Sequence, residues 1–140
     1  MKLTRILSLA LALVLALSLF SCFAPKNLDA LWENATYTTD KTLGKGEKTL
    51  YVEVIAGETA ITFTIKTDKN TVGEALAEHE LIAGEESAYG LYVKTVNGIL
   101  ADYDIDQSYW GFYKNGEMML SGVDTTEFTS GDHFELKYEK

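Results

Sequence analysis

Two alternating runs of residues place the strongest constraint on how this chain folds. Apolar and polar residues alternate over residues 49–54 and again over residues 61–66, with Gly57 and Glu58 between the runs. A period of two is typical of a half-buried strand, because successive side chains of a strand point to opposite faces. The two runs therefore predict a β-hairpin with one apolar face and one wet face.

The hydrophobic period changes after this hairpin. Thr71 and Glu74 have the spacing of a capping box, which marks the start of a helix. The following residues share one stripe of that helix: Val72, Ala75, Leu76 and His79. Gly84 is the expected end of the helix. Because His79 lies at the edge of an apolar stripe, a structural role is favoured over a ligand role.

Two Asn-Gly pairs, Asn97-Gly98 and Asn115-Gly116, indicate further hairpins. Strands are expected at residues 91–96, 99–104, 109–114, 117–120 and 133–138. A hairpin, one helix and then several short strands predict an α+β fold, with a β-grasp-like mixed sheet packed on one helix.

The first 22 residues carry the features of an export signal. Lys2 and Arg5 precede an uncharged, mainly apolar run over residues 6–20, which is too short to cross a bilayer. The segment from Leu19 to Cys22 resembles the lipobox of bacterial lipoproteins, in which the cysteine takes a diacylglycerol before cleavage ahead of it. Cys22 would then be the lipid-anchored N-terminus of a protein on the extracytoplasmic side of the cell membrane. The alternative is an ordinary secretory signal cut after Ala24.

The chain is expected to have three parts: a signal peptide at 1–21, a membrane-proximal spacer at 22–46 and one domain at 47–140. The spacer holds the only proline, Pro25, and a polar run punctuated by glycine. Trp32 is unusual in a spacer. It suits either a short helical turn that docks on the domain or a segment leading to an edge strand at Tyr37. Since Cys22 is the only cysteine, the domain has no internal disulfide and depends on packing.

Composition excludes several classes of function. The formal charge is −9, and removal of Lys2 and Arg5 with the signal makes it −11, so the surface repels nucleic acid. The domain offers no thiol for attack, no glycine-rich phosphate loop and no serine in a nucleophile-elbow setting. We therefore expect a protein that is not an enzyme and has no cofactor of its own.

The aromatic run at 109–114 provides the candidate binding site. Trp110 and Phe112 are expected to face the core, whereas Tyr109 and Tyr113 face outward across a gap left by Gly111. A flat ligand could approach the backbone through that gap. The candidate ligand-binding residues are Tyr109, Gly111, Tyr113, Asn115 and Met118. A tyrosine pair that only covers the sheet, and a turn role for Asn115, are the alternatives.

Asp102, Asp104 and Asp106 begin like a calcium loop. Gln107 stands where the turn glycine of an EF-hand belongs, and Tyr113 stands where its bidentate glutamate belongs. This is therefore not an EF-hand. On a strand the three carboxylates would share one face, where they form either a weak cation site or a solvated edge that discourages aggregation.

Several segments resemble one bacterial surface family. They are GLYVKTVNGILADYD, YWGFYKNGE, GVDTTEF and GDHFELKY. The family is related to the C-terminal domain of transcobalamin and intrinsic factor, and LWENATYTTDKTLGKG is similar to its lipoprotein members in Gram-positive bacteria. The resemblance implies a β-grasp of the soluble-ligand-binding type with no catalytic residues.

The resemblance also suggests a ligand, because the animal relatives bind cobalamin. In those relatives a large helical domain covers much of the vitamin, and nothing in this chain supplies such a domain. Affinity should therefore be weak unless a partner or a second copy completes the site. The expected function is capture of cobalamin or another corrinoid for an uptake transporter. The alternative is a non-catalytic envelope module that binds a protein or a glycan.

Overall fold

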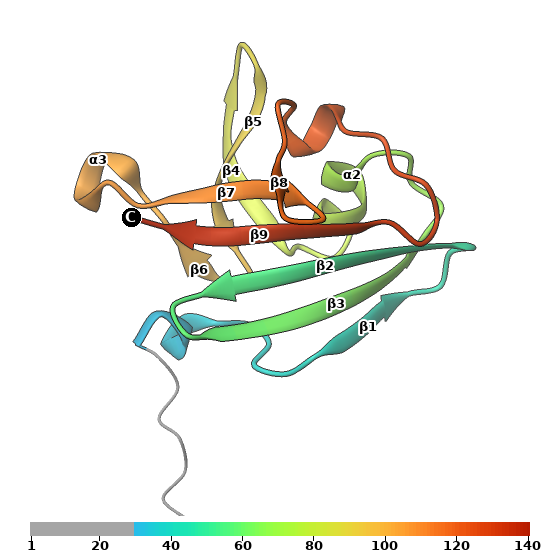
Figure 1. The fold of residues 1–140 in the computed structure, drawn as a ribbon, viewed down its shortest axis with the longest axis horizontal. Coiled ribbons are helices and arrows are strands. Elements are labelled where there is room, and N and C mark those ends of the chain that lie inside the picture. Colours follow the sequence, from blue (N-terminus) through green and yellow to red (C-terminus); the bar gives the residue numbers. More distant parts are fainter. Residues whose placement is uncertain (1–29) are drawn as a thin grey trace, which may run out of the picture.

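The computed structural model describes residues 30–140, which form two β-sheets with a few short helices (Figure 1). The larger sheet has the strand order β1-β3-β2-β9-β7-β8, and the smaller has the order β4-β5-β6. The larger sheet contains β1 (Lys41–Gly44), β2 (Lys48–Ala56), β3 (Thr59–Thr67), β7 (Tyr109–Lys114), β8 (Glu117–Met118) and β9 (His133–Glu139). The smaller sheet contains β4 (Ile82–Ser87), β5 (Gly90–Val96) and β6 (Ile99–Leu100). The helical segments are η2 (Ala30–Asn34), α2 (Val72–Ala77), α3 (Tyr103–Asp106) and η3 (Val123–Thr125).

The predicted α+β class is confirmed. The larger sheet is mixed, because β1 runs parallel to β3 and β9 runs parallel to β2, whereas the other pairs are antiparallel. The alternation predicted for β2 and β3 holds residue by residue, with Val52 paired to Phe63 on the buried face. Helix α2 adds buried apolar side chains to the same core. The β4–β5 hairpin stands away from the larger sheet (Figure 1).

Both Asn-Gly turns are confirmed as two-residue hairpin loops. Asn97 and Asn115 have φ values of 52° and 50°, and the glycines that follow have values of 80° and 83°. Positive φ at both central residues is the geometry of a type I′ turn, which asparagine and glycine tolerate best. The two turns differ in burial, since Asn97 is buried and Asn115 is exposed.

The predicted helix begins at its capping box but ends earlier than expected. The Thr71 hydroxyl accepts the Glu74 N–H at 3.2 Å, as the box requires. The chain turns at Glu80, whose φ is 55°, and continues as β4. Gly84 is therefore not a helix cap. It lies at a β-bulge, where an added Cβ would be 1.9 Å from the Tyr92 carbonyl oxygen.

The strand predicted at 99–104 is wrong beyond Leu100. The Asp102 carboxylate accepts the Asp104 N–H at 3.0 Å and caps the short helix α3. Asp106 accepts the Ser108 N–H at 3.1 Å, just after the helix. Aspartate side chains compete in this way for backbone donors, and this favours capped turns over strands.

The predicted spacer is wrong for residues 30–46, which belong to the folded domain. Trp32 is 1% exposed, and its indole N–H donates to the Ala56 carbonyl at 2.9 Å. Strand β1 pairs with β3 and forms one edge of the larger sheet. The helical turn predicted at Trp32 is therefore present, and the edge strand is present too but begins at Lys41 instead of Tyr37. The signal peptide, the lipobox and Cys22 lie outside the described residues.

Candidate functional site

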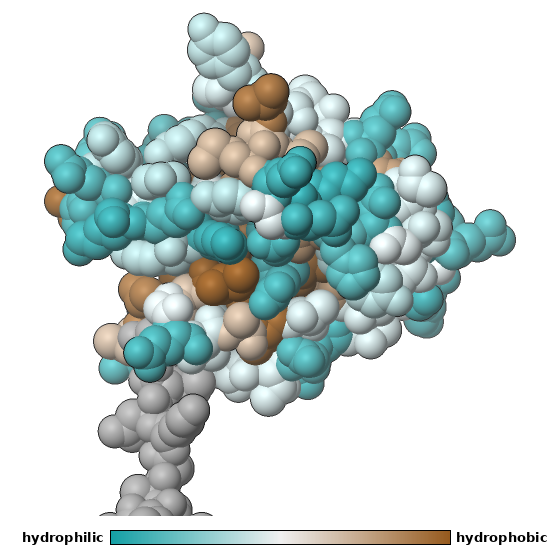
Figure 2. Space-filling model, viewed as in Figure 1, coloured by the Kyte–Doolittle hydropathy of each residue, from teal (hydrophilic) through white to brown (hydrophobic). Residues whose placement is uncertain are grey.

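The larger sheet buries one face and presents the other to solvent, and we call the solvent side the outer face. Its side chains alternate with those of the core along each strand. They include Thr42, Tyr51, Glu53, Ile55, Thr62, Thr64, Lys66, Tyr109, Tyr113, Met118, His133, Glu135, Lys137 and Glu139. The surface seen in Figure 2 is mainly hydrophilic, in keeping with the acidic composition.

The predicted orientation of strand β7 is confirmed. Trp110 is buried, and Phe112 packs on the core by stacking against Phe134 with ring centroids 5.4 Å apart. Tyr109 and Tyr113 lie on the outer face, and Met118 is the strand partner of Tyr113.

The predicted gap over Gly111 is wrong, because neighbouring side chains fill it. An added Cβ at Gly111 would lie 2.8 Å from Cε2 of Tyr113 and 2.9 Å from Oε2 of Glu139. The Tyr113 hydroxyl donates to Oε1 of Glu139 at 2.7 Å, which fixes the ring over the glycine. Glycine therefore makes room for a tyrosine of the same strand and not for a ligand.

The same contact changes the ionisation of Tyr113. The hydrogen bond to the Glu139 carboxylate is the main cause that raises the pKa of Tyr113 to about 12, and burial adds to the effect. We expect Glu139→Gln to bring this pKa back toward 10. The phenol carbon shift of Tyr113, followed by NMR as the pH is raised, measures the change. An unchanged titration in Glu139→Gln would contradict the closed geometry over Gly111.

Asn115 and Met118 extend the Tyr113 region to the edge of the sheet. Asn115 is exposed in its type I′ turn, and Met118 is 62% exposed. Of the five predicted binding residues, Tyr109, Gly111, Tyr113 and Met118 share the outer face and Asn115 lies at its rim. The role of Tyr109, Tyr113, Asn115 and Met118 as ligand contacts stays a prediction, whereas Gly111 is covered by Tyr113 and Glu139.

The three aspartates do not share a strand face as predicted. Asp102 caps α3, Asp104 lies in its first turn, and Asp106 is held by Ser108. The hydrogen bonds from Ser108 lower the pKa of Asp106. Across residues 30–140, no three His, Cys, Asp or Glu residues form a group that could hold a metal ion.

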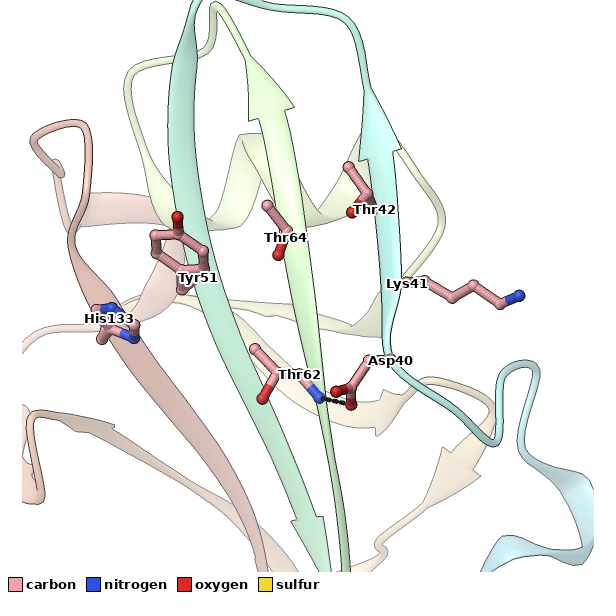
Figure 3. Close-up of a pocket in the computed structure, with 7 residues that line it drawn as sticks. All are labelled: Asp40, Lys41, Thr42, Tyr51, Thr62, Thr64 and His133. Atoms are coloured by element: carbon pink, nitrogen blue, oxygen red, sulfur yellow. Dashed lines mark hydrogen bonds between the residues drawn. The ribbon is translucent and has the colours of Figure 1, made fainter.

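Sequence reasoning missed a hollow on the outer face between β1 and β9. Its volume is about 370 Å³, near the lower end of the range of roughly 300 to 1,000 Å³ for small-molecule sites. Figure 3 shows Tyr51 and His133 on one side, Thr62 and Thr64 in the middle, and the start of β1 on the other side. The lining residues are Asp40, Lys41, Thr42, Tyr51, Thr62, Thr64 and His133. We call this the outer-face hollow.

Strand register assembles the outer-face hollow from distant parts of the chain. Thr42, Thr64, Tyr51 and His133 form one row across four adjacent strands. The Tyr51 and His133 rings stack with centroids 4.4 Å apart and planes 12° apart. Asp40 accepts the Thr62 N–H at 2.8 Å, which fixes its carboxylate at the rim. A rigid aromatic wall therefore faces a floor of threonines.

A second hollow, of about 430 Å³, lies where the loops after β1 and β3 meet α2. Its polar groups are largely engaged within the protein. The Thr67 hydroxyl donates to Glu78 at 3.1 Å, and Asp68 accepts the Glu47 N–H at 2.9 Å. Lys66 donates to the Thr49 hydroxyl at 2.6 Å. The outer-face hollow, with more unengaged polar groups, is therefore the better candidate for a ligand site.

Several solved structures are similar to this chain, among them the following two. One, described as a candidate metal-binding protein from Ruminococcus gnavus, is 38% identical with a TM-score of 0.64 and matches 67% of this chain and 98% of its own. The other is haptocorrin in complex with Cbi, which is 18% identical with a TM-score of 0.54. That match covers 70% of this chain but 26% of haptocorrin, so it shows a shared fold for about a quarter of that protein.

Within residues 30–140, no helix is long and apolar enough to cross a membrane.

Two further comparisons address the family of the chain. No curated protein matches the chain. A family model matches residues 69–140, from the loop before α2 to the end of the chain. The chain therefore belongs to the family described as a domain of unknown function, DUF4430.

Proposed function

We propose that the chain is a non-catalytic, lipid-anchored module that binds a soluble ligand on the extracytoplasmic side of the membrane. The observation that carries ligand binding is the outer-face hollow, with its stacked Tyr51 and His133 wall. Concave sites that combine aromatic surface with a few polar groups suit small molecules. Tyr109, Tyr113, Asn115 and Met118 would supply further contacts on the other half of the outer face.

A corrinoid is the first ligand to test, with an uptake transporter as the recipient. The fold is shared with a part of haptocorrin, whose structure contains Cbi, and the sequence resembles a bacterial family related to the C-terminal domain of transcobalamin. A hollow of about 370 Å³ would hold one edge of a corrinoid and not the whole molecule. Weak affinity is therefore expected unless a partner or a second copy covers the other side.

Calorimetry with cobalamin and cobinamide tests this proposal. The protein would be residues 27–140, which contain every described part of the fold. We expect saturable heat with one-to-one stoichiometry, reduced by Tyr51→Leu and unchanged by Tyr89→Leu. Tyr89 is a matched control because its side chain is 93% exposed and it lies on the β4–β5 hairpin, outside the hollow lining. The absence of heat for both compounds would contradict corrinoid capture and favour the envelope module that binds a protein or a glycan.

Membrane attachment is tested at Cys22. Cys22→Ser removes the thiol that would carry the lipid, so we expect the protein to leave the membrane fraction or to remain unprocessed. Fractionation of cells followed by mass measurement of the N-terminus gives the answer. Cleaved Cys22→Ser protein that stays in the membrane fraction would contradict lipid anchoring.

A further inference from the structure

We propose that the outer-face hollow binds one pyranose ring of a neutral glycan. The inference rests on the proposed ligand-binding function, but it does not depend on a corrinoid. It follows from the charge, the hydrogen-bonding groups and the aromatic wall of the hollow, which together describe the chemistry of a sugar.

The charge of the lining favours a neutral ligand. Asp40 and Lys41 are its two charged residues, and their formal charges cancel. Figure 3 shows the Lys41 side chain extending away from the threonines, so its ammonium group does not lie over the threonine floor of the hollow. An anionic ligand would therefore find no ammonium group on the floor, and the one carboxylate of the lining, Asp40, already accepts the Thr62 N–H.

The floor favours a ligand that carries many hydroxyl groups. The side-chain hydroxyls of Thr62, Thr64 and Tyr51 have no hydrogen-bond partner among residues 30–140, so each can both donate and accept. Asp40 uses one carboxylate oxygen to accept the Thr62 N–H, which leaves the other oxygen to accept from a ligand hydroxyl. Hydroxyls of a sugar can replace the waters that serve these groups in the free protein.

The wall favours a ring that has an apolar face. Tyr51 stacks on His133 with one face of its ring, which holds the tyrosine upright and leaves its other face toward Thr64 and the hollow. The C–H face of a pyranose packs flat against such an aromatic surface, while its hydroxyls project sideways. An open-chain polyol carries similar hydroxyls but presents no such face.

Saturation-transfer NMR on residues 27–140 tests the inference. The probes are the methyl β-pyranosides of glucose, galactose and N-acetylglucosamine, and sorbitol is the open-chain control. We expect transfer to at least one pyranoside, strongest at H1, H3 and H5, because these protons share one face of the ring. Sorbitol should receive none. Absence of transfer to all three pyranosides, or equal transfer to sorbitol, would overturn the inference.

Variants locate the site. Tyr51→Phe keeps the aromatic face but loses the hydroxyl, so it should weaken binding less than Tyr51→Leu does. Tyr51→Leu should weaken binding about tenfold, the loss expected for an aromatic contact. Tyr89→Leu should bind as the parent does. Retention of full binding in Tyr51→Leu would overturn the inference. Thermal melts of each variant serve as the control for folding.

The corrinoid calorimetry and the pyranoside NMR test the two proposals independently of each other. Corrinoid heat without transfer to any pyranoside would overturn the sugar site and leave corrinoid capture standing. Transfer to a pyranoside without corrinoid heat would support the sugar site and remove the corrinoid.

Discussion

Trp32→Ala is expected to destabilise the domain by about 3 to 5 kcal/mol, the usual cost of truncating a buried aromatic side chain to alanine. The indole is 1% exposed and lies in the core with the residues of β2 and β3. The substitution leaves a cavity and also removes the donor to the Ala56 carbonyl. Urea unfolding followed by circular dichroism measures the free energy of unfolding.

Two further variants separate packing from hydrogen bonding at this position. Trp32→Phe keeps an aromatic ring but loses the indole N–H, so it should cost less than Trp32→Ala. Tyr89→Ala truncates an aromatic residue that is 93% exposed and should change stability by less than about 0.5 kcal/mol. If Trp32→Ala unfolded at the same urea concentration as the parent, residues 30–46 would be a spacer after all.

Asn97→Ala should cost about 3 kcal/mol, because it removes two buried hydrogen bonds and forces alanine into a left-handed conformation. The Asn97 side chain accepts the Tyr37 N–H at 2.9 Å and donates to the Tyr37 carbonyl at 2.8 Å. The Asn97 side chain is 1% exposed, so its amide is shielded from solvent where it binds the half-buried Tyr37. Unfolding in urea again provides the measurement.

The second Asn-Gly turn is the matched control. Asn115 has nearly the same φ as Asn97, but its side chain is exposed in the turn. Asn115→Ala should therefore lower the free energy of unfolding only by the strain of placing alanine in a left-handed conformation, about 1 kcal/mol. The difference between the stability losses of Asn97→Ala and Asn115→Ala therefore measures the contribution of the hydrogen bonds to Tyr37. Equal losses would show that Asn97 does not hold the N-terminal segment to the domain.

Local pattern was enough to predict much of the fold. Alternation placed β2, β3 and β7, the Asn-Gly pairs placed two hairpin turns, and the capping box placed the start of α2. The errors occur where a side chain competes for the backbone. Asp102 caps α3 where alternation predicted a strand, and Gly84 serves a bulge where it resembled a helix cap.

The candidate site was less accessible to prediction, because it depends on pairing between distant strands. The outward orientation of Tyr113 follows from alternation, but its contact with Glu139 requires the register of β7 against β9. The stack of Tyr51 on His133 requires β9 to run parallel beside β2, which no short-range pattern specifies. The alternation over residues 49–54 puts Tyr51 on the wet face of its strand, but no sequence pattern pairs it with a histidine more than 80 residues away.

The central claim is that the outer face of the larger sheet binds the ligand. The most direct test is an NMR titration of nitrogen-labelled residues 27–140 with cobinamide and, separately, with the methyl pyranosides. We predict that at least one ligand moves the amide signals of Tyr51, Thr62, Thr64 and His133. If no ligand moved any signal, or if the shifts were confined to the smaller sheet and α2, the claim would be contradicted.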